Sequence, residues 1–319
     1  MQNHLSPEIF ELDNQHFSQN HCEHWQLLTD QDNIIHWIQQ ALNLPSSPMG
    51  LCPSETQMNP DYWLIQGPTS SKDILCTQVH AVQNNKPQQL THAFPTLHSP
   101  YAYEAKINLI KTNKQHSEAI LSLQINDTTV FAFDNFYTVN RAFYNKHQKY
   151  NVHLSAWAYR LEPIPDHETV TIDDPNAIRH HRALNNILAE HQGKTPDNLQ
   201  SLLQEWQPKS EADKQPITID ISKTMAYLYG DSLGQEDEAW FQGQIVGKTQ
   251  TQFMGQTFTL YDVIFIDSSE LEANQEKVIV RLATKNADES NFEIGQFIRG
   301  DIWLQATIFN TCKGKFQQF

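Results

Sequence analysis

The sequence predicts an α+β fold in which two small OB-like or sandwich-like β-modules are joined by a helical hairpin and preceded by an α/β region. A faint internal repeat is the first sign, because the interval from Val130 to Leu154 equals that from Val280 to Leu304. A repeat at so long a period indicates two related β-modules. Short runs of alternating hydrophobicity surround both copies, and a stretch of helical periodicity separates them. The expected domains are an N-terminal region 1–99, a first module 100–165, a hairpin with linker 166–217 and a second module 218–319.

The N-terminal region combines one helix with loops and a strand. Apolar spacing from Ile34 to Leu42 predicts a helix, with capping oxygens at 29–32 before it and Pro45 after it. The proline-rich stretch 45–60 is expected to be loop. The apolar run 74–82 predicts a strand.

Short strands dominate both modules. In the first, Val152, Leu154 and Ala156 alternate with polar residues, which is typical of a half-buried strand. Strands are expected at 105–111, 118–125, 128–133 and 150–161 in the first module, and at 240–248, 258–267, 277–284 and 300–309 in the second. Strands of this length and spacing favour a small barrel or sandwich.

The middle segment changes to helical periodicity. Asp174 followed by Pro175 is an N-cap with proline at the first helical position, and Gly193 is expected to end that helix. Thr195 and Pro196 form the same N-cap and proline pair at the start of a second expected helix, whose apolar residues share one face. The sequence therefore predicts a helical hairpin, followed by a polar linker at 207–217.

Composition indicates a protein of the cytoplasm that carries reduced thiols and holds neither a metal nor a cofactor. There is no apolar run long enough to cross a membrane, and the first residues lack the pattern of a signal peptide. The cysteines are scattered, with no Cys-x-x-Cys pair. The net charge of −15 disfavours general binding to a phosphate backbone and favours encounter with basic proteins.

An acidic run beside an aromatic residue is the candidate partner-binding patch. Glu236, Asp237 and Glu238 immediately precede Trp240. Aromatic anchors beside charged groups suit protein interfaces, although a charge run is more often a solvated face. We expect a protein partner of basic charge to bind here.

Single-stranded nucleic acid is the alternative ligand. The first module is the only part of the chain with a basic balance, and outward aromatic side chains of an OB-like module can stack bases. The candidate residues are Phe133, Arg141, Lys146, Lys149 and Trp303. Packing of these aromatic side chains between modules is the simpler interpretation.

Catalysis ranks third, and no catalytic residue is predicted. Gly230-Asp231-Ser232-Leu233 resembles the nucleophile block of the GDSL esterases, which implies a serine nucleophile with a histidine base downstream. This sequence departs from that pattern because no histidine follows His191. His21 and His24 have helical spacing for an ion, but nothing nearby completes a site. His180 and His181 are expected on the polar face of a helix.

The segments 131–159 and 295–305 resemble β-modules of uncharacterised bacterial proteins. The first runs from Phe131-Ala132-Phe133-Asp134 to Trp157-Ala158-Tyr159, and the second includes Gly300-Asp301-Ile302-Trp303-Leu304-Gln305. The resemblance implies OB-like modules and transfers no functional residue. Some small acidic bacterial proteins of this kind are immunity proteins that neutralise secreted toxins. The leading hypothesis is therefore non-enzymatic protein binding through an acidic surface, in the form of toxin neutralisation.

Overall fold

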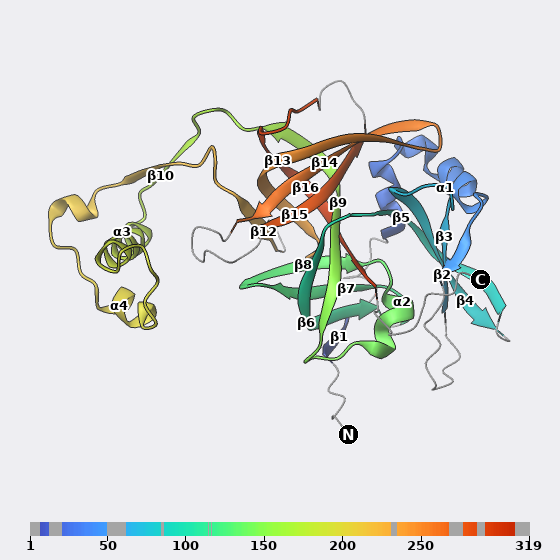
Figure 1. Cartoon of the computed structure of the whole chain (residues 1–319), viewed down its shortest axis with the longest axis horizontal. Coiled ribbons are helices and arrows are strands. Elements are labelled where there is room, and N and C mark those ends of the chain that lie inside the picture. The colour runs from blue at the N-terminus through green and yellow to red at the C-terminus, as the bar shows by residue number, and fades with distance from the viewer. Residues whose placement is uncertain are drawn as a thin grey trace.

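The computed structural model describes residues 7–12, 21–49, 62–83, 86–113, 115, 117–230, 235–267, 277–285 and 291–309. The chain is mostly β, with 52% strand and 19% helix. The predicted fold class is wrong, because the strands of both predicted modules belong to one mixed ten-stranded sheet (Figure 1). In the part of the chain that the structure describes, no helical hairpin links two separate modules. Among the described residues, no helix has the length and apolar character needed to cross a membrane.

The sheet closes on itself into two rings of strands. Its order is β1 (Glu8–Leu12), β6 (Ala102–Asn113), β7 (Ala119–Ile125), β8 (Thr128–Asp134), β16 (Phe297–Ile308), β9 (Lys149–Pro163), β15 (Val278–Lys285), β14 (Gln256–Ile266), β13 (Glu238–Phe253) and β12 (Ala226–Tyr229). Two further pairings, β6 with β9 and β13 with β16, close the rings. One ring is β6-β7-β8-β16-β9 and the other is β13-β14-β15-β9-β16. The two rings therefore share β9 and β16.

The shared strands carry the internal repeat. Ser155 on β9 pairs with Gln305 on β16, and the flanking pairs are Ala156 with Leu304 and Leu154 with Ala306. This antiparallel register is unchanged when the two repeats are exchanged. The parallel pairings follow the same arrangement with a register shift of two residues, because Phe133 of β8 pairs with Gln305, whereas Arg281 of β15 pairs with Ser155. Each repeat thus contributes its last strand to the ring of the other.

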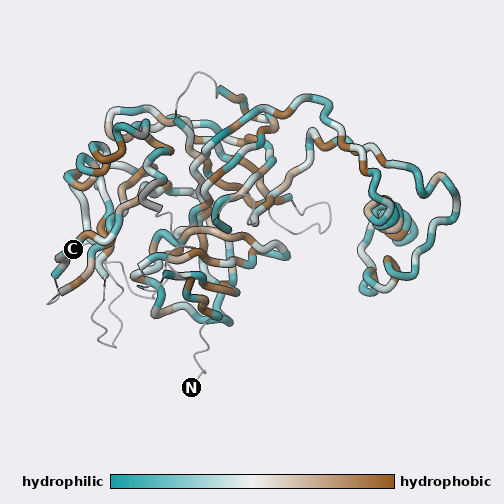
Figure 2. The backbone as a smooth tube through the Cα atoms, turned by 180° about the vertical axis from the view of Figure 1, so that it is seen from behind, coloured by the Kyte–Doolittle hydropathy of each residue, from teal (hydrophilic) through white to brown (hydrophobic). Residues whose placement is uncertain are grey.

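Alternating apolar residues fill the interior of both rings. The inward residues of each strand form one continuous core, while the outward residues alternate with them. It includes Leu123, Val130, Leu154, Val263, Val280 and Leu304. A short turn of helix, α2 (Tyr137–Asn140), and the 3-10 turn η3 (Arg141–Phe143) connect β8 to β9. Hydrophobic stretches run along the ring strands in Figure 2.

The N-terminal elements cover one outer face of the sheet. They are η1 (His21–Leu27), η2 (Gln31–Asn33), α1 (Ile34–Leu42), β2 (Ser47–Met49), β3 (Tyr62–Gly67), β4 (Ile74–Gln83) and β5 (Lys86–Leu97). The predicted helix and the strand at 74–82 are confirmed. The expected loop at 45–60 contains β2, and residues 50–60 lie outside the described part. An aromatic second core, with Trp25, Trp157 and Trp303, joins these elements to the rings.

Two polar side chains of the shared strands dock β5 onto the rings. Ser155 Oγ donates to the carbonyl of Leu97 at 2.7 Å, and Gln305 Oε1 accepts from the N–H of Leu97 at 3.1 Å. Gln305 Nε2 also donates to the carbonyl of Pro95 at 2.7 Å. Both side chains are almost completely buried, so these bonds satisfy backbone groups of β5 inside the protein.

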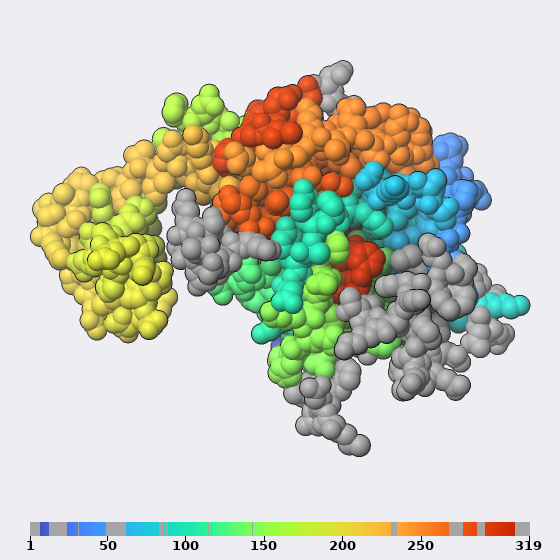
Figure 3. All heavy atoms as spheres, viewed as in Figure 1, coloured from blue at the N-terminus to red at the C-terminus, as the bar shows by residue number. Residues whose placement is uncertain are grey.

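The segment from β10 (Thr169–Ile172) to β11 (Ile217–Asp220), here called the arm, projects from the rings as a separate lobe on a narrow neck (Figures 1 and 3). It contains α3 (Pro175–Glu190), α4 (Leu199–Glu205) and the 3-10 turn η4 (Glu211–Lys214). Asp174 caps α3 by accepting from Ala177 N–H at 2.8 Å, as its sequence indicates. The predicted linker is partly wrong, because it contains η4 and the start of β11.

Candidate functional site

A row of outward-facing side chains crosses the outer face of four strands. Leu228 on β12 pairs with Trp240 on β13, Trp240 with Asp301 on β16, and Asp301 with Arg160 on β9. Tyr159 is the extra residue of a β-bulge beside Asp301, because Ile302 pairs with Ala158. Leu228 is 56% exposed, Tyr159 is 37% exposed and Arg160 is also exposed, whereas Trp240 and Asp301 are half-buried. We call Tyr159, Arg160, Leu228, Trp240 and Asp301 the exposed strip.

One border of the exposed strip is a buried polar cluster. The Trp303 indole N–H donates to Asp237 Oδ2 at 2.9 Å, and the ring stacks on His24 at 4.0 Å between centroids. The Tyr159 hydroxyl lies 2.7 Å from both Glu238 Oε1 and His24 Nδ1. Since it donates its one proton to Glu238, it accepts from His24. Loss of hydration, and then Glu238, raises the pKa of Tyr159 far above its usual value, so the hydroxyl stays protonated.

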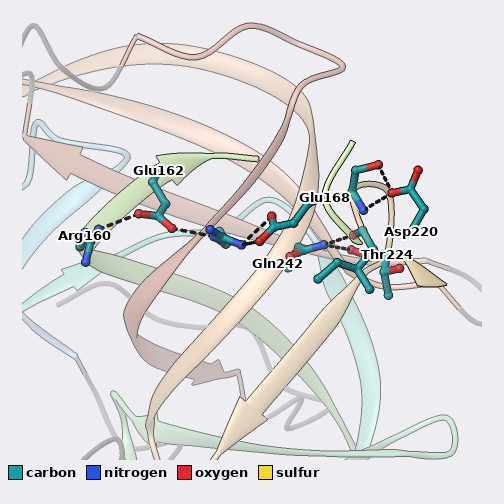
Figure 4. Close-up of polar contacts among 9 residues, drawn as sticks. Arg160, Glu162, Glu168, Asp220, Thr224 and Gln242 are labelled. Atoms are coloured by element: carbon teal, nitrogen blue, oxygen red, sulfur yellow. Dashed lines mark hydrogen bonds and ion pairs between the residues drawn. The ribbon is translucent and has the colours of Figure 1, made fainter. Parts of the chain in front are cut away.

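The other border is the root of the arm, where a chain of ion pairs crosses the sheet (Figure 4). Arg299 Nε donates to Glu162 at 2.6 Å, and its Nη1 contacts both oxygens of Glu168 at 2.7 Å. Arg160 bonds to the second oxygen of Glu162 at 2.6 Å. The Arg299 hydrogen bond holds the pKa of Glu162 below its usual range. This chain ties β9 and β16 to the segment that enters the arm.

The segment that leaves the arm is held by an amide. Gln242, which is 2% exposed, donates through Nε2 to the carbonyls of Ile221 at 2.6 Å and Thr224 at 2.9 Å. Asp220 bonds to the N–H and hydroxyl of Ser222 at 2.9 and 2.6 Å (Figure 4). Both connections of the arm are therefore anchored beside the exposed strip.

Carboxylates outnumber cations around the exposed strip. Two guanidinium groups, Arg160 and Arg299, face five carboxylates, Glu162, Glu168, Asp220, Glu238 and Asp301. The excess has the sign of the whole chain, whose net charge is −15. A surface of this kind attracts cationic proteins over about a Debye length, roughly 8 Å at physiological salt.

Replacement of Arg299 by methionine is expected to loosen the arm root. The change leaves Glu162 and Glu168 without their shared cation, which we expect to cost about 1 kcal/mol of local stability for side chains that are partly exposed. Backbone amides of β10 and β11 should then exchange about fivefold faster with deuterium. Arg160→Met, whose side chain is 71% exposed, is the control. Equal exchange in the two variants would show that Arg299 does not hold the arm.

The four predicted partner-binding residues divide between surface and interior. Trp240 lies in the exposed strip, and Glu238 bonds to Tyr159 at its border. Glu236 forms an ion pair with Lys111, and Asp237 is completely buried against Trp303. Tyr159, Arg160, Leu228 and Asp301 were not anticipated. Strand alternation alone does not reveal two successive outward residues at a bulge, nor which strands lie side by side.

The predicted nucleic-acid residues do not gather on one surface. Phe133 and Trp303 have no exposed surface, and their rings lie 5.4 Å apart in the second core. Arg141 lies over the Tyr62 ring. Lys146 and Lys149 are exposed near the start of β9, where Lys149 pairs with Glu104. The structure therefore separates the aromatic members of the set from the basic ones.

The remaining candidates fall outside any common site. Asp231, Ser232 and Leu233 lie outside the described residues, as do the side chains of His21 and Cys22. His180 and His181 lie on α3 of the arm. Within the described ranges, no group of three or more His, Cys, Asp or Glu side chains could hold a metal. Comparison of the chain with protein-family models, curated proteins and solved structures found no match.

Proposed function

We propose that this protein is a non-enzymatic binding protein, which binds a basic protein partner through the exposed strip. The observation that carries the proposal is an outward-facing row on a carboxylate-rich face, in which Tyr159, Leu228 and Arg160 are exposed and Trp240 is half-buried. Tryptophan, tyrosine and arginine are the residues that most often dominate binding energy at protein interfaces. Neutralisation of a basic toxin is the finer form of the proposal, supported by the acidic charge.

The setting of the exposed strip favours a preorganised interface. The backbone under Asp301 is paired on both sides, with Trp240 of β13 and Arg160 of β9, and the backbone under Arg160 is held by the β16 side of this pairing. Hydrogen bonds to Glu238 and His24 fix the Tyr159 hydroxyl. Side chains that are already ordered lose less conformational entropy on binding, which leaves more of the contact energy as affinity.

Trp240→Ala is expected to weaken partner binding at least about tenfold, since it removes the central aromatic side chain of the exposed strip. Val246→Ala, which shortens a 39% exposed side chain on the same strand, is the control and should leave affinity unchanged. Circular dichroism of both variants establishes that the fold is retained. The partner is isolated on immobilised wild-type protein, identified, purified and titrated by calorimetry at two salt concentrations.

The titration separates protein binding from its alternatives. The proposal expects a cationic protein whose affinity falls with salt and with Trp240→Ala. Equal affinity of the wild type and Trp240→Ala for the isolated partner contradicts it, as does capture of no protein in excess over the variant. Salt-sensitive binding of a short oligothymidylate by the wild type would instead support single-stranded nucleic acid.

A further inference from the structure

A wedge opens between β12 and the end of β14. At Gln244, β13 pairs with β16 on one edge and with β14 on the other. β12 uses the same edge as β14, because Ala226 pairs with Gln242 on the side away from β16. Beyond Ile264 the end of β14 no longer pairs with β13 and stays paired with β15 alone, through Ile266 and Val278. The two strands therefore diverge, and β12 is the last strand of the described sheet order.

A cavity of about 660 Å³ lies in this wedge. Tyr227 and Tyr229 of β12 form one wall, and Phe265 and Asp267 at the end of β14 form another. The turn before β8 adds Asp127. The cavity thus combines aromatic faces with carboxylates beside an edge strand.

β8 and β12, the two strands that face the cavity, differ in how their backbone groups are hydrogen-bonded. On β8, Phe131 is satisfied by the Tyr227 hydroxyl, which accepts from its N–H at 3.2 Å and donates to its carbonyl at 3.3 Å. β12 pairs with β13 along one edge, and its other edge borders the wedge. Leu228 and Tyr229, at 56% and 43% exposure, place apolar surface on both faces of this edge strand. Such an edge is a template for another strand.

We infer that the partner inserts an extended, arginine-bearing segment into the wedge, where it pairs with β12. This inference rests on the proposed function and names its mode of recognition. Backbone pairing to β12 supplies affinity, and alternate side chains of the segment face opposite sides of the sheet. One set covers Leu228, at the end of the exposed strip. The other set enters the cavity.

Arginine is the side chain that the cavity fits best. A guanidinium stacks on tyrosine rings and donates to carboxylates in one plane, as Tyr227, Tyr229 and Asp127 allow. Two cations oppose it. Lys223 lines the cavity but is exposed, so its ammonium can turn to solvent. Lys277 pairs with Asp267 at 2.8 Å, which partly neutralises the carboxylate of Asp267.

A capped peptide of alternating arginine and valine tests the inference on the full chain. We expect it to bind and to shift the backbone amide resonances of β12 in a heteronuclear NMR spectrum. Methylation of alternate peptide nitrogens keeps the charge but removes strand pairing, and should weaken binding at least about tenfold. A glutamate–valine peptide of the same length should not bind. Tyr229→Ala should weaken the arginine peptide, and Val246→Ala should not.

The outcomes separate this inference from the proposed function. Equal binding of the methylated and unmethylated peptides overturns strand addition, as do unshifted β12 amides. An oligothymidylate that shifts the same amides also overturns it, because the wedge would then accept bases. If the peptide pairs with β12 while Trp240→Ala leaves partner binding intact, the proposed function of the exposed strip fails and the wedge site stands. If the peptide does not pair with β12 but Trp240→Ala weakens partner binding, the wedge site fails and the proposed function of the exposed strip stands.

Discussion

Gly300→Ala is expected to lower the free energy of unfolding by about 3 kcal/mol or more. Gly300 lies on shared strand β16, between Leu161 of β9 and Phe241 of β13. A Cβ at this position would overlap the backbone carbonyl oxygen of Arg160, next to the bulge at Tyr159. The nearest atoms all belong to the backbone of β9 at Arg160 and Leu161, so no flexible side chain can move away. Relief requires a shift of a strand that belongs to both rings.

Urea denaturation followed by tryptophan fluorescence measures this loss. Thr249→Ala, at an exposed position on β13, is the control and should stay within about 0.5 kcal/mol of the wild type. The Gly300→Ala protein should unfold at much lower urea with a similar slope, because the same surface is exposed. A midpoint equal to that of the control would mean that the shared strands can separate at little cost.

Asp134→Asn is expected to remove a large pH dependence of stability. Asp134 is 2% exposed, accepts from the Tyr144 hydroxyl at 2.5 Å and from Phe136 N–H at 2.9 Å, and its burial raises its pKa to about 7. Between pH 4 and 7 the folded state keeps a proton that the unfolded state releases. Stability therefore falls as pH rises through this window, by up to about 4 kcal/mol for a shift of about three pKa units.

The comparison is made as a difference between two pH values. Unfolding free energies of the wild type and Asp134→Asn are measured at pH 4 and pH 8, and the gain of the variant over the wild type should be larger at pH 8. Asp173→Asn, on an exposed carboxyl before α3, should follow the wild type. Parallel curves for the wild type and Asp134→Asn would show that the buried carboxyl is ionised throughout.

Strands were more predictable from the sequence than their pairing. The alternation of Val152, Leu154 and Ala156 predicts which residues of β9 face the ring interior, and these three do. The opposite face is not solvated as expected, because β5 covers Ser155. Alternation is local, whereas β9 pairs with β16, β15 and β6 from both repeats. The sequence therefore indicated two copies but not the exchange of their last strands. That exchange turns two expected modules into one sheet.

The candidate site was predicted only where side chains stay at the surface. Trp240 was anticipated because an aromatic residue follows an acidic run, and it lies in the exposed strip. Asp237 and Trp303 show the opposite case. Asp237 is a polar residue of the turn before β13 and Trp303 faces outward from β16, but each is buried against the other, and His24 stacks on Trp303. Burial by a segment that is remote in sequence leaves no local pattern.

The pair Ser155 and Gln305 also determines how the N-terminal sheet can dock on the two repeats. They occupy equivalent positions of the two repeats and lie where the exchange symmetry maps one onto the other. The antiparallel register centres an approximate twofold relation on this pair, and among the described strands β5 docks against it. Identical residues there would offer β5 two equal orientations. A short hydroxyl opposite a long amide removes the degeneracy, so a duplicated scaffold accepts one N-terminal sheet in one direction.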